Sequence, residues 1–220
     1  MKKESKKINE FNEEFKYYVY SPNEINKGMT AIVFLHGIGE RGANLNDIEK
    51  YALPKYMNIF DIPFIVIAPQ CHDNNFWDYH LREVEKMIDA EQKEYNFDKE
   101  NIFLCGYSMG AFGAWNYLIE RPELFKGIVS VSGGIMLPIQ YNLDIIKDKP
   151  MLMYHGEKDD IVDVENSLIA YEKLKQNNAS DIELKLLPYA NHFLSDDVFQ
   201  DQYMYDWLKQ KSKTKKKTIK

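Results

Sequence analysis

Ser108 lies in a segment whose glycine spacing suits a nucleophile. An apolar run ends in Gly106-Tyr107-Ser108-Met109-Gly110, and a stretch of small and apolar residues follows. This is the G-x-S-x-G pattern, which places a serine on a sharp turn between a strand and a helix. The two glycines are needed because a Cβ at either position would collide with the neighbouring strand or helix. The turn would expose Ser108 at the positive end of a helix, where an oxyanion is stabilised.

A serine hydroxyl is a poor nucleophile near neutral pH, so it needs a base. Among the five histidines, His192 follows the last predicted strand and precedes the final predicted helix. Ligands of open parallel sheets bind beyond the carboxyl ends of the strands, so a loop there can bring an imidazole onto the serine. His36 and His155 each end a strand before a glycine, and we expect them to shape their loops by hydrogen bonding. His72 and His80 come too early in the chain for the base.

An orienting acid is expected in the segment 155–163, directly after the predicted strand 151–154. Asp159 and Asp160 are adjacent there, and the pattern alone leaves both open. The chain order serine, aspartate, histidine is that of the α/β-hydrolases and differs from the order in other common triads.

The oxyanion of the reaction needs hydrogen-bond donors, and the segment 36–42, His-Gly-Ile-Gly-Glu-Arg-Gly, can supply one. A glycine-rich turn lets backbone N–H groups point into a site without obstruction by side chains. We expect the oxyanion hole to consist of the N–H groups of Ile38 and Met109. Removing one such donor typically costs about 3 kcal/mol of transition-state stabilisation.

Other chemistries fit the sequence less well. The glycines of segment 36–42 formally match G-x-G-x-x-G, but Glu40 and Arg41 fill the intervening positions and Asp61 precedes a strand instead of ending one. No Cys/His cluster has metal-ligand spacing, and no H-E-x-x-H motif occurs. We therefore expect no metal and no organic cofactor.

Length and composition predict one globular domain. The 220 residues are 45% apolar and 14% aromatic, enough for a sizeable core. No uncharged apolar window is long enough for a transmembrane helix. The basic N-terminus has no apolar segment behind it, so we expect no secretory signal, a cytoplasmic location and free thiols at Cys71 and Cys105.

The charge is unevenly distributed along the chain. The formal net charge is −6, yet residues 209–220 hold seven lysines and no acid. We expect a flexible N-terminus over 1–14, a folded domain over 15–208 and a basic disordered tail over 209–220. The acidic body argues against nucleic acid as a partner. The expected ligand is a small-molecule ester, and a homodimer remains open.

Apolar runs alternate with helix-like stretches, which predicts an α/β fold with a mostly parallel central sheet and helices on both faces. Several runs are continuously apolar, as expected for strands buried on both faces. No segment is long enough for a large cap domain, so the site should be open. Predicted strands are Phe15–Tyr20, Ala31–Leu35, Phe64–Ala68, Ile102–Cys105, Gly127–Val131, Met151–Tyr154 and Ile182–Leu187, and predicted helices are Tyr79–Tyr95, Met109–Ile119, Val164–Gln176 and Asp197–Lys209.

The chain resembles the compact serine esterases of the α/β-hydrolase superfamily, with the closest likeness to the phospholipase/carboxylesterase, polyhydroxybutyrate-depolymerase-like and feruloyl/acetylxylan-esterase branches. The resemblance spans about residues 15–208. It rests on Phe34-Leu35-His36-Gly37-Ile38-Gly39-Glu40-Arg41-Gly42, Ala68-Pro69-Gln70-Cys71, Trp77, Gly106-Tyr107-Ser108-Met109-Gly110, Pro122-Glu123-Leu124-Phe125, Ser132-Gly133-Gly134 and His155-Gly156-x-x-Asp159-x-x-Val162.

The resemblance implies an α/β-hydrolase fold and favours Asp159 over Asp160 as the acid. It also suggests that Gln70 and Trp77 border the acyl or alcohol pocket, with packing behind the site as an equal alternative. Glu40 and Arg41 resemble an ion pair that fastens the loop, and a substrate contact by Arg41 is a further possibility.

These observations predict a serine hydrolase that cleaves carboxylic esters, with short acyl groups or with acyl groups on a sugar or aryl alcohol. The catalytic triad would be Ser108, His192 and Asp159, acting through an acyl-enzyme. Two alternatives within the hydrolases are a thioesterase and a serine peptidase with the same triad. From another class, the chain can be a hydrolase-shaped binding protein without turnover.

Overall fold

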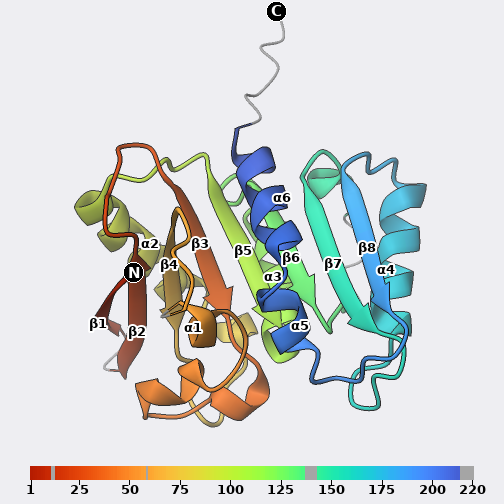
Figure 1. The fold of residues 1–220 in the computed structure, drawn as a ribbon, viewed down its shortest axis with the longest axis horizontal. Coiled ribbons are helices and arrows are strands. Elements are labelled where there is room, and N and C mark those ends of the chain that lie inside the picture. The colour runs from red at the N-terminus through yellow and green to blue at the C-terminus, as the bar shows by residue number, and fades with distance from the viewer. Residues whose placement is uncertain (11–12, 58, 137–142, 214–220) are drawn as a thin grey trace, which may run out of the picture.

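In the computed structural model, the described residues 1–10, 13–57, 59–136 and 143–213 form an eight-stranded sheet (Figure 1). The strand order is β1-β2-β4-β3-β5-β6-β7-β8. Strands β3 to β8 are parallel, while β2 pairs antiparallel with both β1 and β4. The strands are β1 Lys2–Glu10, β2 Glu13–Ser21, β3 Thr30–Leu35, β4 Phe64–Pro69, β5 Ile102–Tyr107, β6 Gly127–Val131, β7 Met151–Gly156 and β8 Ile182–Leu187.

The five central strands β3 to β7 are buried at every position. Their sequences are continuously apolar because helices cover both faces of the sheet, as we expected. The order of the strands also brings the carboxyl ends of β3, β5 and β7 to one edge of the sheet. The predicted mostly parallel α/β architecture is confirmed.

Two hydrophobic clusters lie on opposite faces of this sheet. Helices α2, α3 and α4 cover one cluster and α1, α5 and α6 the other, with α6 in front of the sheet in Figure 1. Cys71 and Cys105 are buried in different clusters and are both free. The helices are α1 Ala52–Tyr56, α2 Leu81–Tyr95, α3 Met109–Glu120, α4 Glu165–Gln176, α5 Ser195–Phe199 and α6 Gln202–Ser212, with 3₁₀ turns at Ile38–Glu40, Leu45–Glu49, Trp77–Tyr79 and Leu143–Ile146.

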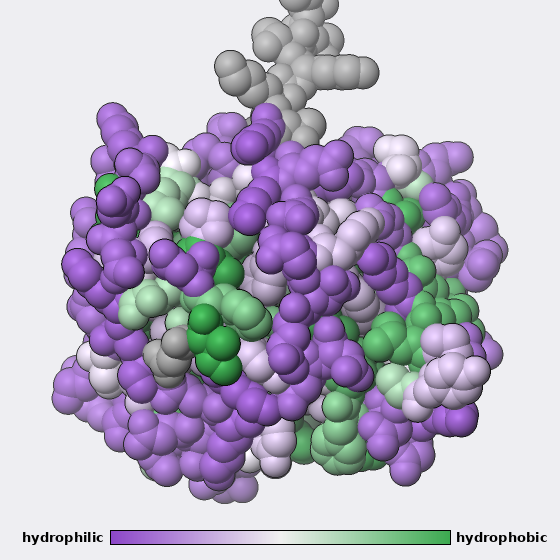
Figure 2. Space-filling view, viewed as in Figure 1, coloured by the Kyte–Doolittle hydropathy of each residue, from purple (hydrophilic) through white to green (hydrophobic). Residues whose placement is uncertain are grey.

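The predicted helix 197–209 differs from the observed structure because it is divided into α5 and α6. Asp201 is the N-cap of α6, and its side chain accepts a hydrogen bond from the N–H of Tyr203. Such a cap starts a new helix, which explains the break. Helix α6 continues to Ser212, into the segment where we expected a disordered tail, and residues 214–220 lie outside the described residues. The face that α5 and α6 cover is mostly hydrophilic, with hydrophobic surface in separate patches (Figure 2).

Residues 2–10, which we expected to be flexible, form the edge strand β1. This strand has mostly exposed side chains, so its sequence lacks the apolar pattern of a buried strand. Ion pairs attach this strand to α2. The Lys6 ammonium lies 2.8 Å from a carboxylate oxygen of Glu91 and 2.8 Å from one of Glu94. Glu91 also accepts a hydrogen bond from the Tyr17 hydroxyl at 2.8 Å.

We expect Glu91→Ala to destabilise the protein by about 1–3 kcal/mol, because it leaves the Tyr17 hydroxyl and the Lys6 ammonium without their buried partner. Glu91 is 1% exposed, whereas the Glu94 side chain is 54% exposed. Glu94→Ala is the matched control and should cost no more than about 0.5 kcal/mol, because exposed ion pairs contribute little. Urea unfolding measures both, and equal losses would show that β1 is not held through Glu91.

Candidate active site

Ser108 occupies the turn between β5 and α3 in a conformation that few residues adopt. Its φ is 55° and its ψ is −121°, a sparsely populated region for a residue with a side chain. A Cβ on Gly110 would lie 1.9 Å from the carbonyl oxygen of Leu35, and one on Gly106 would lie 2.2 Å from that of Gly110. These contacts leave room only for glycine. The strained turn that the G-x-S-x-G pattern predicted is therefore present.

The imidazole of His192 lies between Ser108 and Asp159. Its Nε2 is 2.9 Å from Ser108 Oγ, and its Nδ1 is 2.8 Å from Asp159 Oδ2 and 3.0 Å from Oδ1. An ionised carboxylate can only accept, so the proton of the neutral ring is on Nδ1 and Nε2 accepts the serine hydroxyl hydrogen. The neighbouring Asp160 is exposed. The structure thus brings Asp159, not Asp160, to the histidine.

The Asp159 carboxylate is completely buried and fully hydrogen-bonded. Its Oδ1 accepts the N–H of Ile161 at 3.0 Å and that of Val162 at 2.8 Å. Burial alone raises the pKa of a carboxyl group, but the N–H groups of Val162 and Ile161 and the His192 ring outweigh it and hold the pKa of Asp159 below its usual value. Asp159 is accordingly an ionised hydrogen-bond acceptor for His192 at neutral pH.

The loops that follow β7 and β8 are joined by backbone contacts that fix the position of His192. The N–H of Lys158 donates to the carbonyl of Ala190, and that of Glu157 donates to Leu187, each at 3.0 Å. A Cβ on Gly156 would lie only 2.3 Å from the carbonyl oxygen of Ala190. Because the two loops approach this closely, shared backbone contacts fix the positions of Asp159 and His192 relative to each other.

The turn 36–42 lies against the serine, as the sequence predicted. A Cβ on Gly37 would lie 3.5 Å from Ser108 Cβ. Ile38 and Met109 are the first residues of a 3₁₀ turn and of α3, so their N–H groups have no partner within those helices. Both are therefore available as donors beside Ser108.

His36 fastens this turn from inside the protein. Its Nε2 accepts the N–H of Cys71 at 2.9 Å, and its Nδ1 donates to the carbonyl of Gly37 at 2.6 Å. Its own carbonyl accepts the indole N–H of Trp77 at 3.0 Å. This agrees with the loop-shaping role that we expected for His36.

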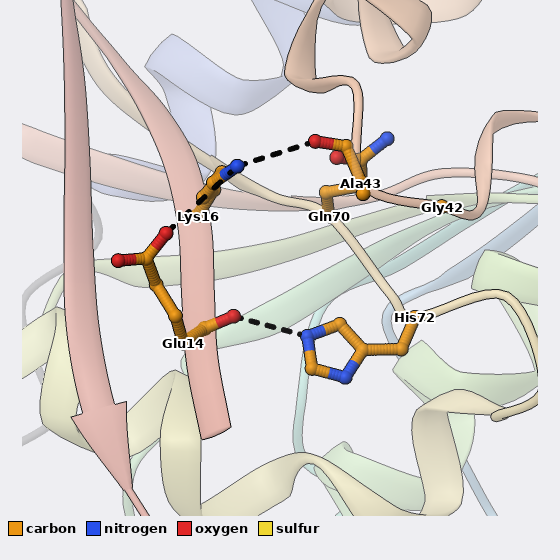
Figure 3. A pocket seen from close by; sticks show the side chains of 6 residues that line it. All are labelled: Glu14, Lys16, Gly42, Ala43, Gln70 and His72. Atoms are coloured by element: carbon orange, nitrogen blue, oxygen red, sulfur yellow. Dashed lines mark hydrogen bonds and ion pairs between the residues drawn. The ribbon is translucent and has the colours of Figure 1, made fainter. Parts of the chain in front are cut away.

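Gln70 and Trp77 are both buried behind the turn, at 3% and 2% exposed. The amide nitrogen of Gln70 donates to the carbonyls of Glu40 and Asn44, at 3.0 and 2.9 Å. Of the two roles that we considered for Gln70 and Trp77, these contacts favour packing behind the site. Gln70 also borders a hollow of about 220 Å³ beside β2 (Figure 3), together with Glu14, Lys16, Gly42, Ala43 and His72.

Glu40 and Arg41 do not form the ion pair that we expected. Glu40 is buried, with its Oε2 3.7 Å from His36 Nδ1, and burial raises the pKa of its carboxyl group. The Arg41 guanidinium instead donates to the carbonyls of Ile38 and Asn75, both at 3.2 Å. Adjacent residues in this turn point to different sides, which the sequence does not reveal. Arg41 thus braces the backbone of the turn directly.

Sequence reasoning did not single out Tyr107, which supports His192. The Tyr107 ring is buried, and its hydroxyl donates to the carbonyl of His192 at 3.0 Å. Tyr107 occupies a variable position of the G-x-S-x-G pattern, so the motif gave no reason to select it. The one signal in the sequence that could have selected Tyr107 was its position directly before Ser108, the predicted nucleophile.

Comparison with known proteins identifies the family of the chain. A profile of the phospholipase/carboxylesterase family matches residues 68–209. The chain therefore belongs to this family, has the α/β-hydrolase fold and is a carboxylic ester hydrolase. The match includes the segments that carry Ser108, Asp159 and His192.

Individual relatives are distant in sequence. The chain is 24% identical to a probable carboxylesterase of Arabidopsis thaliana (SOBER1-like), over 86% of this chain and 81% of that protein. It is 20% identical to an acyl-protein thioesterase 1 homologue of Dictyostelium discoideum, over 81% of this chain and 90% of the relative.

Solved structures show the same fold. A thermostable esterase superimposes with a TM-score of 0.81 and 26% identity, over 94% of this chain and 62% of its own length. A feruloyl esterase module of Clostridium thermocellum gives a TM-score of 0.75 at 18% identity, over 94% of this chain and 86% of the module. None of the helices in the described residues has the length and apolar character required to cross a bilayer.

The stability of the protein should depend on pH through His36. Burial lowers the pKa of His36 from 6.5 to about 4. The unfolded chain therefore binds a proton below pH 6.5 that the folded protein does not bind until about pH 4, so acidification through this window favours unfolding. We expect this histidine to lower the free energy of unfolding by roughly 3 kcal/mol at most across the window. Denaturant titrations at several pH values should give a shallower dependence for His36→Gln, and superimposable curves would contradict this assignment.

Proposed function

We propose that the protein is a serine carboxylesterase in which Ser108, His192 and Asp159 form the catalytic triad. The observation that carries this proposal is the position of His192, whose two ring nitrogens lie 2.9 Å from Ser108 Oγ and 2.8 Å from Asp159 Oδ2. A serine with a histidine base and a buried acid behind it is the arrangement that makes a hydroxyl nucleophilic.

The reaction follows from this geometry. His192 Nε2 takes the hydroxyl proton while Ser108 Oγ attacks the ester carbonyl, and Asp159 stabilises the imidazolium that forms. The N–H groups of Ile38 and Met109 donate to the developing oxyanion. The imidazolium then protonates the leaving alcohol, which departs and leaves an acyl-enzyme. Water, deprotonated by His192, attacks this intermediate and releases the acid and free Ser108.

Exposed apolar side chains in the turns that carry Ile38 and His192 support an ester with a compact apolar or aromatic group. Ile38 is 51% exposed next to the proposed oxyanion donor, and Phe193 is 65% exposed next to His192. The Phe193 ring lies 5.8 Å from the His192 ring, measured between centroids. Such a surface binds a short acyl chain or an aryl group without enclosing it, so we propose short-chain and sugar- or aryl-linked esters as the substrate class.

The direct test is ester hydrolysis by the Ser108→Ala variant. The wild-type protein should cleave short-chain p-nitrophenyl esters with an initial burst of nitrophenol, because the acyl-enzyme accumulates. The variant should lose the burst and fall to a small residual rate. Stopped-flow absorbance measures both. Wild-type rates in a folded Ser108→Ala protein would refute the proposal.

The two adjacent aspartates provide a matched pair. Asp159→Asn should lower kcat by about 10⁴-fold, because an amide no longer holds the His192 proton on Nδ1 or stabilises the imidazolium. Asp160→Asn should change kcat less than about twofold, since that side chain is exposed and outside the hydrogen-bonded chain. Steady-state kinetics separate the two, and equal effects would rule out the assignment of the acid.

A thioesterase activity is the second candidate, because one relative is named an acyl-protein thioesterase. The same triad can attack esters, thioesters and activated amides. The three activities are therefore distinguished by the relative rates at which the protein cleaves these substrates. Comparing kcat/KM for a matched ester, thioester and aminoacyl amide decides between esterase, thioesterase and peptidase. Labelling of Ser108 by a fluorophosphonate, absent in Ser108→Ala, separates all three from a binding protein without turnover.

A further inference from the structure

A second histidine lies behind the acid of the proposed triad. His155 is the fifth residue of β7, four residues before Asp159, and its side chain is completely buried. Its Nδ1 lies 2.7 Å from the Ser167 hydroxyl oxygen. Its Nε2 lies 2.9 Å from the carbonyl oxygen of Val162 and 3.2 Å from Asp159 Oδ2, the oxygen that His192 also contacts. The Asp159 carboxylate is thus held between two imidazoles.

The neighbours of Nε2 require a proton on that nitrogen. A backbone carbonyl such as that of Val162 only accepts hydrogen bonds, and so does the ionised carboxylate of Asp159. An unprotonated Nε2 would place its lone pair against two oxygen acceptors in a buried site. Nε2 of His155 is therefore an N–H group.

The neighbours of Nδ1 require a proton there as well. The Ser167 hydroxyl has a single hydrogen, and its oxygen lies 2.6 Å from the carbonyl oxygen of Gly133. That short contact between two oxygens is a hydrogen bond only if Ser167 donates to Gly133. The hydroxyl then has no hydrogen left for His155, so Nδ1 must donate to Ser167.

We propose that His155 carries both ring protons and acts as a cationic positioning residue for Asp159. Within the described ranges, Asp159, in the loop after β7, is the one charged group that lies against this ring. The ring's other partners there are the Ser167 hydroxyl from α4 and the Val162 carbonyl. A buried cation is stable only beside a compensating charge, which Asp159 provides at 3.2 Å. The catalytic consequence of this arrangement rests on the proposed triad.

The consequence concerns the acid side of the pH profile. A positive charge behind Asp159 partly neutralises the carboxylate and so opposes proton uptake by His192 from solvent. His155 would thus extend esterase activity toward acid.

Nuclear magnetic resonance of the ¹⁵N-histidine-labelled wild-type protein tests the protonation state without reference to activity. We expect both ring nitrogens of His155 to carry slowly exchanging protons at pH 7, with the resonances assigned by their loss in His155→Gln. A single ring N–H on His155 would overturn the proposal. If both protons are present but Ser108→Ala retains full ester hydrolysis, the triad assignment fails while the protonation state stands.

The kinetic test uses the acidic limb of kcat/KM against pH. In His155→Gln the limb should move to higher pH by about one unit, because a neutral amide replaces the cation behind Asp159. Ser167→Ala keeps the imidazole but removes the acceptor for Nδ1, so it should shift the limb in the same direction. His80→Gln is the control, because His80 is a buried histidine outside the proposed triad and should leave the limb in place. A loss of kcat in His155→Gln without movement of the limb would reduce His155 to a packing role and refute the proposal.

Discussion

The close approach of α3 to the ends of β3 and β5 is the constraint on which the site depends. Gly106 and Gly110 let the backbone reverse direction within a distance that no side chain would allow. Ser108 is left at φ 55° between them, a conformation that costs free energy and persists only because the surrounding contacts hold it. Because several backbone contacts hold this turn, the serine hydroxyl keeps a fixed position relative to the N-terminus of α3. The Ser108 oxygen is thus positioned by backbone packing, independently of its hydrogen bond to His192.

The remaining groups reach Ser108 because each follows a strand that ends at the same edge of the sheet. Loops after β3, β7 and β8 supply the proposed oxyanion turn, Asp159 and His192 (Figure 1). These loops are fastened by buried side chains that bond to backbone: His36 to the amide of Cys71, and Tyr107 to the carbonyl of His192. Such bonds have no solvent competitor, so they hold a loop more firmly than exposed ion pairs would.

The sequence predicted the central strands, the elbow and the spatial meeting of Ser108 with His192, because buried parallel strands and the G-x-S-x-G turn have local signatures. Asp159 was favoured over Asp160 as the acid only through family resemblance. The two residues are of the same type and differ only in where their side chains point, which the sequence does not show. It missed β1, whose exposed charged side chains pair with α2 instead of entering the core. It also joined α5 to α6, because a single capping aspartate interrupts an otherwise helical pattern. The expected ion pair between Glu40 and Arg41 was also wrong. The directions of adjacent side chains in a turn are set by tertiary packing, which the sequence pattern does not show.

Under the proposed mechanism, reactivity and substrate selection therefore depend on different parts of this molecule. The groups around Ser108 Oγ are buried and fixed through backbone contacts, so changing the ester changes little in how they act. The side chains that would touch the rest of an ester, such as Ile38 and Phe193, are about half exposed or more and project from turns. Exposed apolar side chains can be exchanged without strain in the elbow or loss of the hydrogen bonds behind it. Selectivity among esters can thus change by substitution at these exposed positions while the buried machinery remains constant.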